Sequence, residues 1–234
     1  MLILALDTAT PCGSVAVLRD GQLAGVISTQ TEETYSSRLF RQLEFLRREL
    51  GLEISQFDVF AVAAGPGSFT GLRVGIAAVK GWAEVYAKPI VAVSGLEAVA
   101  AQAQFNDKWI AAVLDARRGQ FYAALFRYGP DDLVLAGVER VCTPAEILEL
   151  LPKHAGSNGL RFISPTPEIL ARALATVHLS GSHSWFTLPA SPVLAPIIGH
   201  LAFRRAKRGE FTDALHLDAN YVRRSDAELL WKGP

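Results

Sequence analysis

The order of predicted strands and helices occurs twice along this chain, and no other feature restricts the fold as strongly. In the first half, an apolar run over 2–6 precedes alternating segments over 14–18 and 22–28, which the turn Asp20-Gly21 joins. This pattern predicts a three-stranded antiparallel meander. Helical and buried-strand patterns then alternate over 34–50, 59–64, 70–87, 89–93 and 94–104.

The second half begins with a similar meander and then alternates again. Its predicted strands cover 109–115, 120–127 and 133–141, and the later segments lie at 143–151, 160–163, 167–175, 176–179 and 191–208. A duplicated order of this kind predicts an α/β fold of two related lobes with mixed sheets. We place the lobes at 1–105 and 106–234, with the option that the terminal helix 191–208 packs back on the first lobe.

The charge balance and the N-terminus exclude several classes of protein. Lys and Arg number 23, as do Asp and Glu, so the chain lacks the basic excess with which a protein binds nucleic acid by itself. The apolar N-terminus is interrupted at Asp7, too early for a signal peptide or a membrane span, and we therefore expect a cytoplasmic protein. The two cysteines, Cys12 and Cys142, cannot form a disulfide framework and are interpreted as small buried residues.

The glycine-rich block Gly65–Gly75 follows a predicted buried strand and opens a helix, a position where backbone N–H groups attract anions. Its spacing, GxGxxxG, is one residue too long for a dinucleotide-binding loop, and the lysine of a P-loop is missing. In a second interpretation, Gly67, Gly71 and Gly75 form a stripe that lets another backbone approach closely. That backbone belongs either to the protein's own sheet or to a partner helix.

A few other residues are candidates for chemistry. Asp7 and Thr8 end the first predicted strand, where they either hold a metal-bound phosphate or close an Asx turn. The segment 115–119 has the same place in the second half, and a hairpin turn is the default interpretation there. Ser68 is predicted to cap the helix that follows the glycine block. The sequence contains neither a histidine pair with metal-ligand spacing nor a GxSxG nucleophile motif.

Several segments, in their order along nearly the whole chain, resemble the motifs of one known family. They are Leu4–Thr10, the block Gly65–Gly75, Val93–Ala98, Leu114–Arg117 and Asn220–Arg223. On these residues the chain resembles the TsaB (YeaZ) family, and the glycine block is the most specific of the motifs. The resemblance implies an actin/Hsp70/sugar-kinase-like (ASKHA) fold of two related lobes.

The resemblance also implies a function in tRNA modification. TsaB-like proteins are regarded as essential, non-catalytic partners of TsaD, which transfers a threonylcarbamoyl group to adenosine in tRNAs that read ANN codons. A small ATPase, TsaE, joins the assembly, and tRNA is reached through the complex. Homodimers and the heterodimer with TsaD are thought to use the same helical surface of the N-terminal lobe.

The chain departs from the related families at three places. TsaD-like proteins carry a metal-binding His-x-x-x-His after the strand that corresponds to 89–93, whereas Ser94–Ala98 of this chain contains no histidine. Many TsaB-like proteins have His-Ser in the first helix, where this chain has Thr34–Ser37, and this leaves the role of Tyr35 open. Asn220 replaces the usual proline of the C-terminal motif.

From the resemblance and the glycine spacing, we expect an activating subunit without catalytic residues or a metal site. We expect it to bind a TsaD-like transferase through the first helix and the helix after the glycine block. The predicted interface residues are Leu39, Leu43, Phe69, Thr70, Gly71, Leu72, Arg73, Gly75, Ile76 and Val79. On this hypothesis, a large residue at Gly71 or Gly75 abolishes the complex and leaves the monomer folded.

The alternative function is that of an ATPase or small-molecule kinase of the same fold, with Asp7, Thr8 and the glycine block as its nucleotide site. Weakly bound ATP or ADP is the only cofactor that we expect. A peptidase is disfavoured, since the sequence offers no nucleophile–base pair. The basic residues at the end of the terminal helix either interact with its dipole or contact tRNA, and they are Arg204, Arg205, Lys207 and Arg208.

Overall fold

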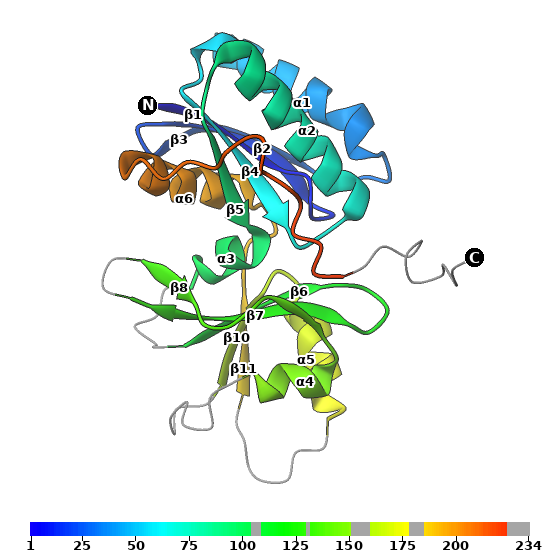
Figure 1. Cartoon of the computed structure of the whole chain (residues 1–234). Helices are drawn as coiled ribbons and strands as arrows, with labels where there is room; N and C mark the ends of the chain where they lie inside the picture. Colours follow the sequence, from blue (N-terminus) through cyan, green and yellow to red (C-terminus); the bar gives the residue numbers. More distant parts are fainter. Residues whose placement is uncertain (104–108, 130–131, 151–159, 178–184, 224–234) are drawn as a thin grey trace, which may run out of the picture. The chain divides into compact units, whose positions relative to one another are not determined.

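The computed structural model of the chain describes residues 1–103, 109–129, 132–150, 160–177 and 185–223 (Figure 1). These residues form two compact units. Unit 1 comprises Met1–Ala98 together with the chain from Val193 onward, and unit 2 comprises Val99–Pro192. Each unit is built on one mixed β-sheet.

The sheet of unit 1 has the strand order β3-β2-β1-β4-β5. Its strands are β1 (Leu2–Asp7), β2 (Gly13–Arg19), β3 (Gln22–Thr29), β4 (Val59–Gly65) and β5 (Ile90–Ser94). The first three strands form an antiparallel meander, and β4 and β5 then add in parallel beside β1. The predicted meander and the buried strands that follow it are therefore confirmed.

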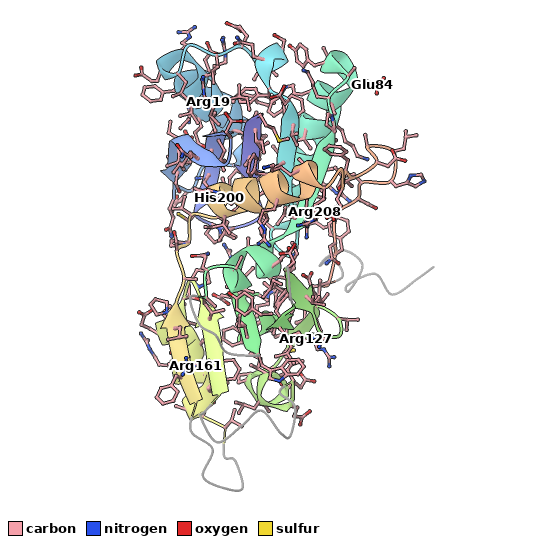
Figure 2. All side chains as sticks on the ribbon, turned by 90° about the vertical axis from the view of Figure 1, so that its left-hand side faces the viewer. Arg19, Glu84, Arg127, Arg161, His200 and Arg208 are labelled. Atoms are coloured by element: carbon pink, nitrogen blue, oxygen red, sulfur yellow. The ribbon has the colours of Figure 1, made fainter. Side chains whose placement is uncertain are left out.

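Helices cover both faces of this sheet, as Figures 1 and 2 show. The covering helices are α1 (Tyr35–Glu49), α2 (Phe69–Tyr86) and α6 (Ala195–Lys207), while the short α3 (Gly95–Ala100) follows β5 and a 3-10 turn lies at Ile54–Gln56. Leu4 and Leu6 of β1 share a core with α1 and α2. On the other face, Gly199 of α6 lies so close to Leu18 that an added Cβ would come within 3.0 Å of Leu18 Cδ2.

The C-terminal part of the chain returns to unit 1, so the division into units differs from the lobes placed at 1–105 and 106–234. α6 packs on β1, β2, β4 and β5. Arg205 of α6 donates to both oxygens of the Glu97 carboxylate, each at 2.7 Å, and to the Ala92 carbonyl oxygen at 2.8 Å. Ser94 caps α3, since its Oγ accepts the Leu96 and Glu97 N–H groups at 3.1 and 3.3 Å. These contacts join α6 to the first unit.

Unit 2 repeats the strand arrangement of unit 1, with the order β11-β10-β6-β7-β8 and with β9 also paired to β7. The strands are β6 (Ile110–Asp115), β7 (Phe121–Tyr128), β8 (Leu133–Leu135), β9 (Arg140–Cys142), β10 (Leu160–Ser164) and β11 (Trp185–Pro189), with helices α4 (Pro144–Glu149) and α5 (Pro167–Ala175). β6 pairs antiparallel with β7 and parallel with β10, just as β1 pairs with β2 and β4. The predicted duplication is confirmed.

Two predicted strands of the second half were wrong in detail. The strand expected over 133–141 is divided into β8 and β9, between which Gly137 has φ of +104°. The last strand of the sheet is β11, not the segment 176–179, of which 178–179 lie outside the described residues.

Within the described part of the chain, no helix combines the length and the apolar character needed to cross a membrane.

Candidate functional site

Asp7 ends β1 at the centre of the unit 1 sheet, and its side chain is fully buried. Its carboxylate closes the turn to β2. Oδ1 accepts the backbone N–H groups of Ala9 and Thr10 at 2.9 and 3.3 Å, and Oδ2 accepts the Thr10 hydroxyl at 2.5 Å. The Asx-turn interpretation of Asp7 describes this geometry, in which both carboxylate oxygens are engaged by the protein's own turn.

The first turn of α1 packs over the same β1–β2 turn. The Tyr35 hydroxyl donates to the Thr10 carbonyl oxygen, and its ring fills the space in which Gly13 has no side chain. Arg38 is buried beside the ring, with Cζ 4.0 Å from the ring centroid, and donates to the Thr29 carbonyl oxygen at 2.8 Å. In this chain, Tyr35 therefore holds the β1–β2 turn against α1.

The burial of Asp7 has a consequence for pH dependence. Burial raises the pKa of Asp7 from 3.8 to about 6, although hydrogen bonds from Thr10 and Ala9 and the charge of Arg38 oppose the shift. The Asp7 carboxyl group therefore holds its proton more tightly in the folded state than in the unfolded state. Its contribution to the free energy of unfolding is complete below about pH 4 and is lost as pH rises through about 6. The difference between the folded and unfolded pKa values of Asp7 corresponds to about 3 kcal/mol in the free energy of unfolding.

Asp7→Asn tests this effect. We expect the variant to lose less stability than the wild type between about pH 4 and about pH 7.5, because an amide does not ionise and still offers an oxygen to Ala9. Urea denaturation of both proteins at the two pH values measures the difference in the free energy of unfolding. An identical pH dependence in both proteins would show that the carboxylate of Asp7 is not the group responsible.

The glycine block lies directly against the end of β1. Cβ atoms added at Gly71 and Gly75 would overlap the carbonyl oxygen and Oγ1 of Thr8, and a Cβ at Gly67 would come within 2.8 Å of Ala9 Cβ. The stripe of Gly67, Gly71 and Gly75 was expected to face either the protein's own sheet or a partner helix. These contacts agree with the first interpretation, since the approaching backbone is the protein's own. Ser68 caps α2 as predicted, with its Oγ accepting the Gly71 N–H at 3.2 Å.

The structure brings together the residues of the predicted nucleotide site, Asp7, Thr8 and the glycine block. Thr8 is buried, and its Oγ1 has no hydrogen-bond partner among the described residues. The close packing of Gly71 and Gly75 on Thr8 leaves no room for a side chain between α2 and β1. Nucleotide binding at these residues stays a prediction.

Five predicted interface side chains form part of the core instead. Leu39, Leu43, Leu72, Ile76 and Val79 are at most 7% exposed and pack in the core of unit 1. The spacing that singled them out marks the apolar face of an amphipathic helix, and that face is buried on the sheet. These residues cannot supply contact area to a partner while unit 1 stays folded, whereas Phe69, Thr70 and Arg73 lie at the surface.

The opposite face of α1 and α2 exposes a second apolar set, which we call the α1–α2 face. It consists of Phe40, Val74, Ala77, Ala78, Gly81, Trp82 and Val85, all partly or fully exposed. Phe40 is 54% exposed and meets Trp82 edge to face at 6.3 Å between ring centroids. Apart from Gly81, its two chain neighbours and the backbone of its own helix, no atom of the described residues lies within 4 Å of a Cβ added at Gly81. Sequence reasoning missed this face, although apolar residues outside the leucine stripe were the available signal.

The other candidate residues have local structural roles. Asp115 Oδ1 accepts the Arg117 N–H at 2.7 Å, and Arg117–Gly119 all have positive φ, which confirms a hairpin turn. Arg208 of the basic group pairs with Glu210 at 2.6 Å. Cys142 is buried as expected, and burial raises the pKa of its thiol to about 11.

Over the described ranges, no three His, Cys, Asp or Glu side chains are grouped so that they could hold a metal ion. Three of the five histidines, His154, His178 and His183, lie outside those ranges.

Comparisons with known proteins give three findings. A family model described as TsaD, tRNA N6-adenosine threonylcarbamoyltransferase, matches residues 17–190. The tRNA threonylcarbamoyladenosine biosynthesis protein TsaB of Bacillus subtilis (strain 168) is 29% identical over 231 residues, which cover 99% of this chain and 98% of that protein. A crystal structure described as an uncharacterized protein with similarity to peptidase YEAZ, from Pseudomonas aeruginosa, has a TM-score of 0.76 at 27% identity and covers 95% of this chain and 99% of that one.

A more distant structure shows only the fold. Component A of the (R)-2-hydroxyglutaryl-CoA dehydratase of Acidaminococcus fermentans has a TM-score of 0.50 at 10% identity and covers 88% of this chain and 99% of that one. Two sheets of the same topology, together with this likeness, show an α/β fold of two related mixed-sheet units. The family model matches more than half of the chain, so the chain belongs to the family of TsaD-like proteins and, within it, to the TsaB (YeaZ) family.

Proposed function

We propose that this chain is a non-catalytic activating subunit in the biosynthesis of threonylcarbamoyladenosine on tRNA, and that it acts by binding a TsaD-like transferase. Its family membership supports the pathway. The observation that carries the binding role is the exposed apolar α1–α2 face. Exposed patches of this kind, with aromatic side chains at their centre, are typical of protein–protein contacts.

The dimensions of the face suit a helical interface. α1 has 15 residues and α2 has 18, and a standard interface removes about 800 Å² of surface from each partner. The small residues Ala77, Ala78 and Gly81 let another helix approach closely, while Phe40 and Trp82 supply apolar area. A contact of two helices with two helices of the partner follows from this arrangement.

The remaining partners follow from the same proposal. A second copy of this chain binds to the α1–α2 face when the transferase is absent, because the face is then exposed to water. A TsaE-like ATPase joins the complex, and tRNA is bound through the transferase rather than by this chain, whose net charge is zero. The proposed location is the cytoplasm.

Reconstitution of the modification tests the proposal. Purified transferase, synthase, ATPase, ATP, threonine, bicarbonate and tRNA are combined with and without this chain, and threonylcarbamoyladenosine is quantified by mass spectrometry. We expect modification only when the chain is present, and none from the chain alone. Full modification in its absence would contradict the activating role.

Calorimetry and an ATP hydrolysis assay on the isolated chain test the alternative function, an ATPase or kinase. Asp7, Thr8 and the glycine block lie together, which is the observation that favours a nucleotide site. The buried carboxylate of Asp7 is already engaged by Ala9 and Thr10, and we therefore expect at most weak ATP binding in calorimetry with magnesium. The ATPase or kinase function would be supported if the isolated chain hydrolysed ATP and the Asp7→Asn variant did not.

A further inference from the structure

Arg73 is held in a fixed position on the exposed side of α2. Its Cζ atom lies 3.8 Å from the centroid of the Phe69 ring, one helical turn earlier. Its Nε donates to the Tyr221 hydroxyl at 2.9 Å, and the rings of Tyr221 and Phe69 pack with their centroids 4.7 Å apart. We call these three residues the Arg73 clamp.

The C-terminal segment brings Tyr221 to this position. After α6, the chain crosses unit 1 beside β5 and the end of β4 (Figure 1). The Thr212 N–H donates to the Ile90 carbonyl oxygen and the Asn220 N–H to the Ala64 carbonyl oxygen, each at 2.7 Å, while Leu217 is buried in the core. Tyr221 is therefore anchored by its own segment before it contacts α2.

The clamp leaves the outer part of the guanidinium available. It engages Nε and one face of the group, and the two terminal nitrogens of Arg73 have no partner among the described residues. The first turn of α2 contains no acidic residue. A guanidinium fixed in this way loses little conformational freedom when it binds, and its two terminal N–H groups match the geometry of a carboxylate.

We propose, on the basis of the function proposed above, that Arg73 binds a carboxylate side chain of the TsaD-like partner and that Tyr221 is its positioning residue. Arg73 continues the exposed row of Ala77 and Gly81 along α2, so a partner helix on the α1–α2 face reaches it. Nucleic acid is the less suitable ligand, because the neighbouring face is apolar and phosphate binding requires several cations.

Affinity measurements with the TsaD-family transferase of the same organism test the proposal, at low and high salt. We expect Arg73→Ala to weaken binding by about tenfold or more and Arg73→Lys to restore only part of it. Tyr221→Phe, which keeps the ring and removes the hydroxyl, should weaken binding by about three- to fivefold. The double variant Arg73→Ala/Tyr221→Phe should bind no more weakly than Arg73→Ala alone, and both should show a smaller salt dependence than the wild type.

Arg19→Ala is the matched control, because Arg19 is also exposed but lies at the end of β2 (Figure 2). It should bind like the wild type. The proposal would be overturned if Arg73→Ala bound the transferase with wild-type affinity, or if the Arg73 and Tyr221 substitutions had independent effects. It would also be overturned if Arg73→Ala weakened only the binding of tRNA by the complex. Failure of the wild-type chain to bind the transferase at all would contradict the proposed function itself, which separates the two failures.

Discussion

Gly71→Ala is expected to lower the free energy of unfolding by about 3 kcal/mol or more, because the added methyl group has no space. The new Cβ would overlap the Thr8 carbonyl oxygen and lie 3.1 Å from the carbon of that carbonyl group. The overlapping atoms are backbone atoms that directly follow β1, the central strand of unit 1, and cannot rotate away as a side chain can. Relief requires a shift of α2 relative to the sheet.

Gly81→Ala is the control for this prediction, since it makes the same change in the same helix. Outside the neighbouring backbone of α2, no described atom lies within 4 Å of the added Cβ, and alanine stabilises a helix interior by up to about 1 kcal/mol relative to glycine. The two variants should therefore shift the midpoint of urea denaturation, followed by circular dichroism, in opposite directions. A Gly71→Ala protein as stable as the wild type would mean that α2 does not approach Thr8 as closely as described.

This expectation reverses the hypothesis that the sequence suggested for Gly71 and Gly75. The spacing alone indicates a surface without side chains, and it does not say which backbone approaches that surface. At Gly75 the added Cβ would overlap Thr8 Oγ1 and lie 3.3 Å from Val62 Cγ2 of β4, so the neighbours are the protein's own strands. A large residue at either glycine is expected to unfold the monomer before any effect on a complex can be measured.

The elements that the sequence predicts well are those with a strong local signal. The alternating pattern of β2, the turn at Asp20-Gly21 and the leucine period of α1 each depend on near neighbours, and all three are present. The repeated order of elements then led to the duplicated topology, because a meander followed by crossovers has few compact arrangements.

The elements that were missed depend on distant contacts. The C-terminal segment has no periodic pattern, yet Thr212 pairs with Ile90, and Leu217 enters the core of unit 1. For α6, packing on the first lobe was only an option at the sequence level, because its own residues carry no signal that assigns it to either unit. The carboxylate of Glu97 pairs with Arg205, which lies more than 100 positions later in the chain, and no local pattern indicates this contact.

The candidate site shows the same limit. The sequence correctly joined Asp7 and Thr8 to the glycine block, because strand ends and the loops after neighbouring parallel strands meet at one edge of a sheet. It selected Leu39 and Leu43 as partner contacts because they are apolar and periodic, and this pattern identifies the buried side of a helix. Phe40 and Phe45 stand outside the pattern, and only their exposure distinguishes them.

Gly81→Arg is expected to weaken binding of the transferase by about a hundredfold or more, while the protein stays folded. The open space around Gly81 accommodates the side chain in the free chain, but a helix packed at about 8–10 Å would meet it. Phe40→Glu should weaken binding through a different route, since it places a charge beside Trp82 in the centre of the α1–α2 face. Both variants should reduce tRNA modification in the reconstituted assay.

Gly81→Ala again serves as the control, because it adds one methyl group to the same position and should keep most of the affinity. Leu39→Ala is the opposite control. Leu39 is 1% exposed, so its truncation should leave a cavity in the core and lower thermal stability. Its effect on affinity should be small in the molecules that remain folded. If Leu39→Ala weakened binding more than Gly81→Arg did, the buried face would have to open on binding, and the α1–α2 face would not be the interface. The opposite ranking places the contact on the exposed side of the two helices, where the small and aromatic residues lie together.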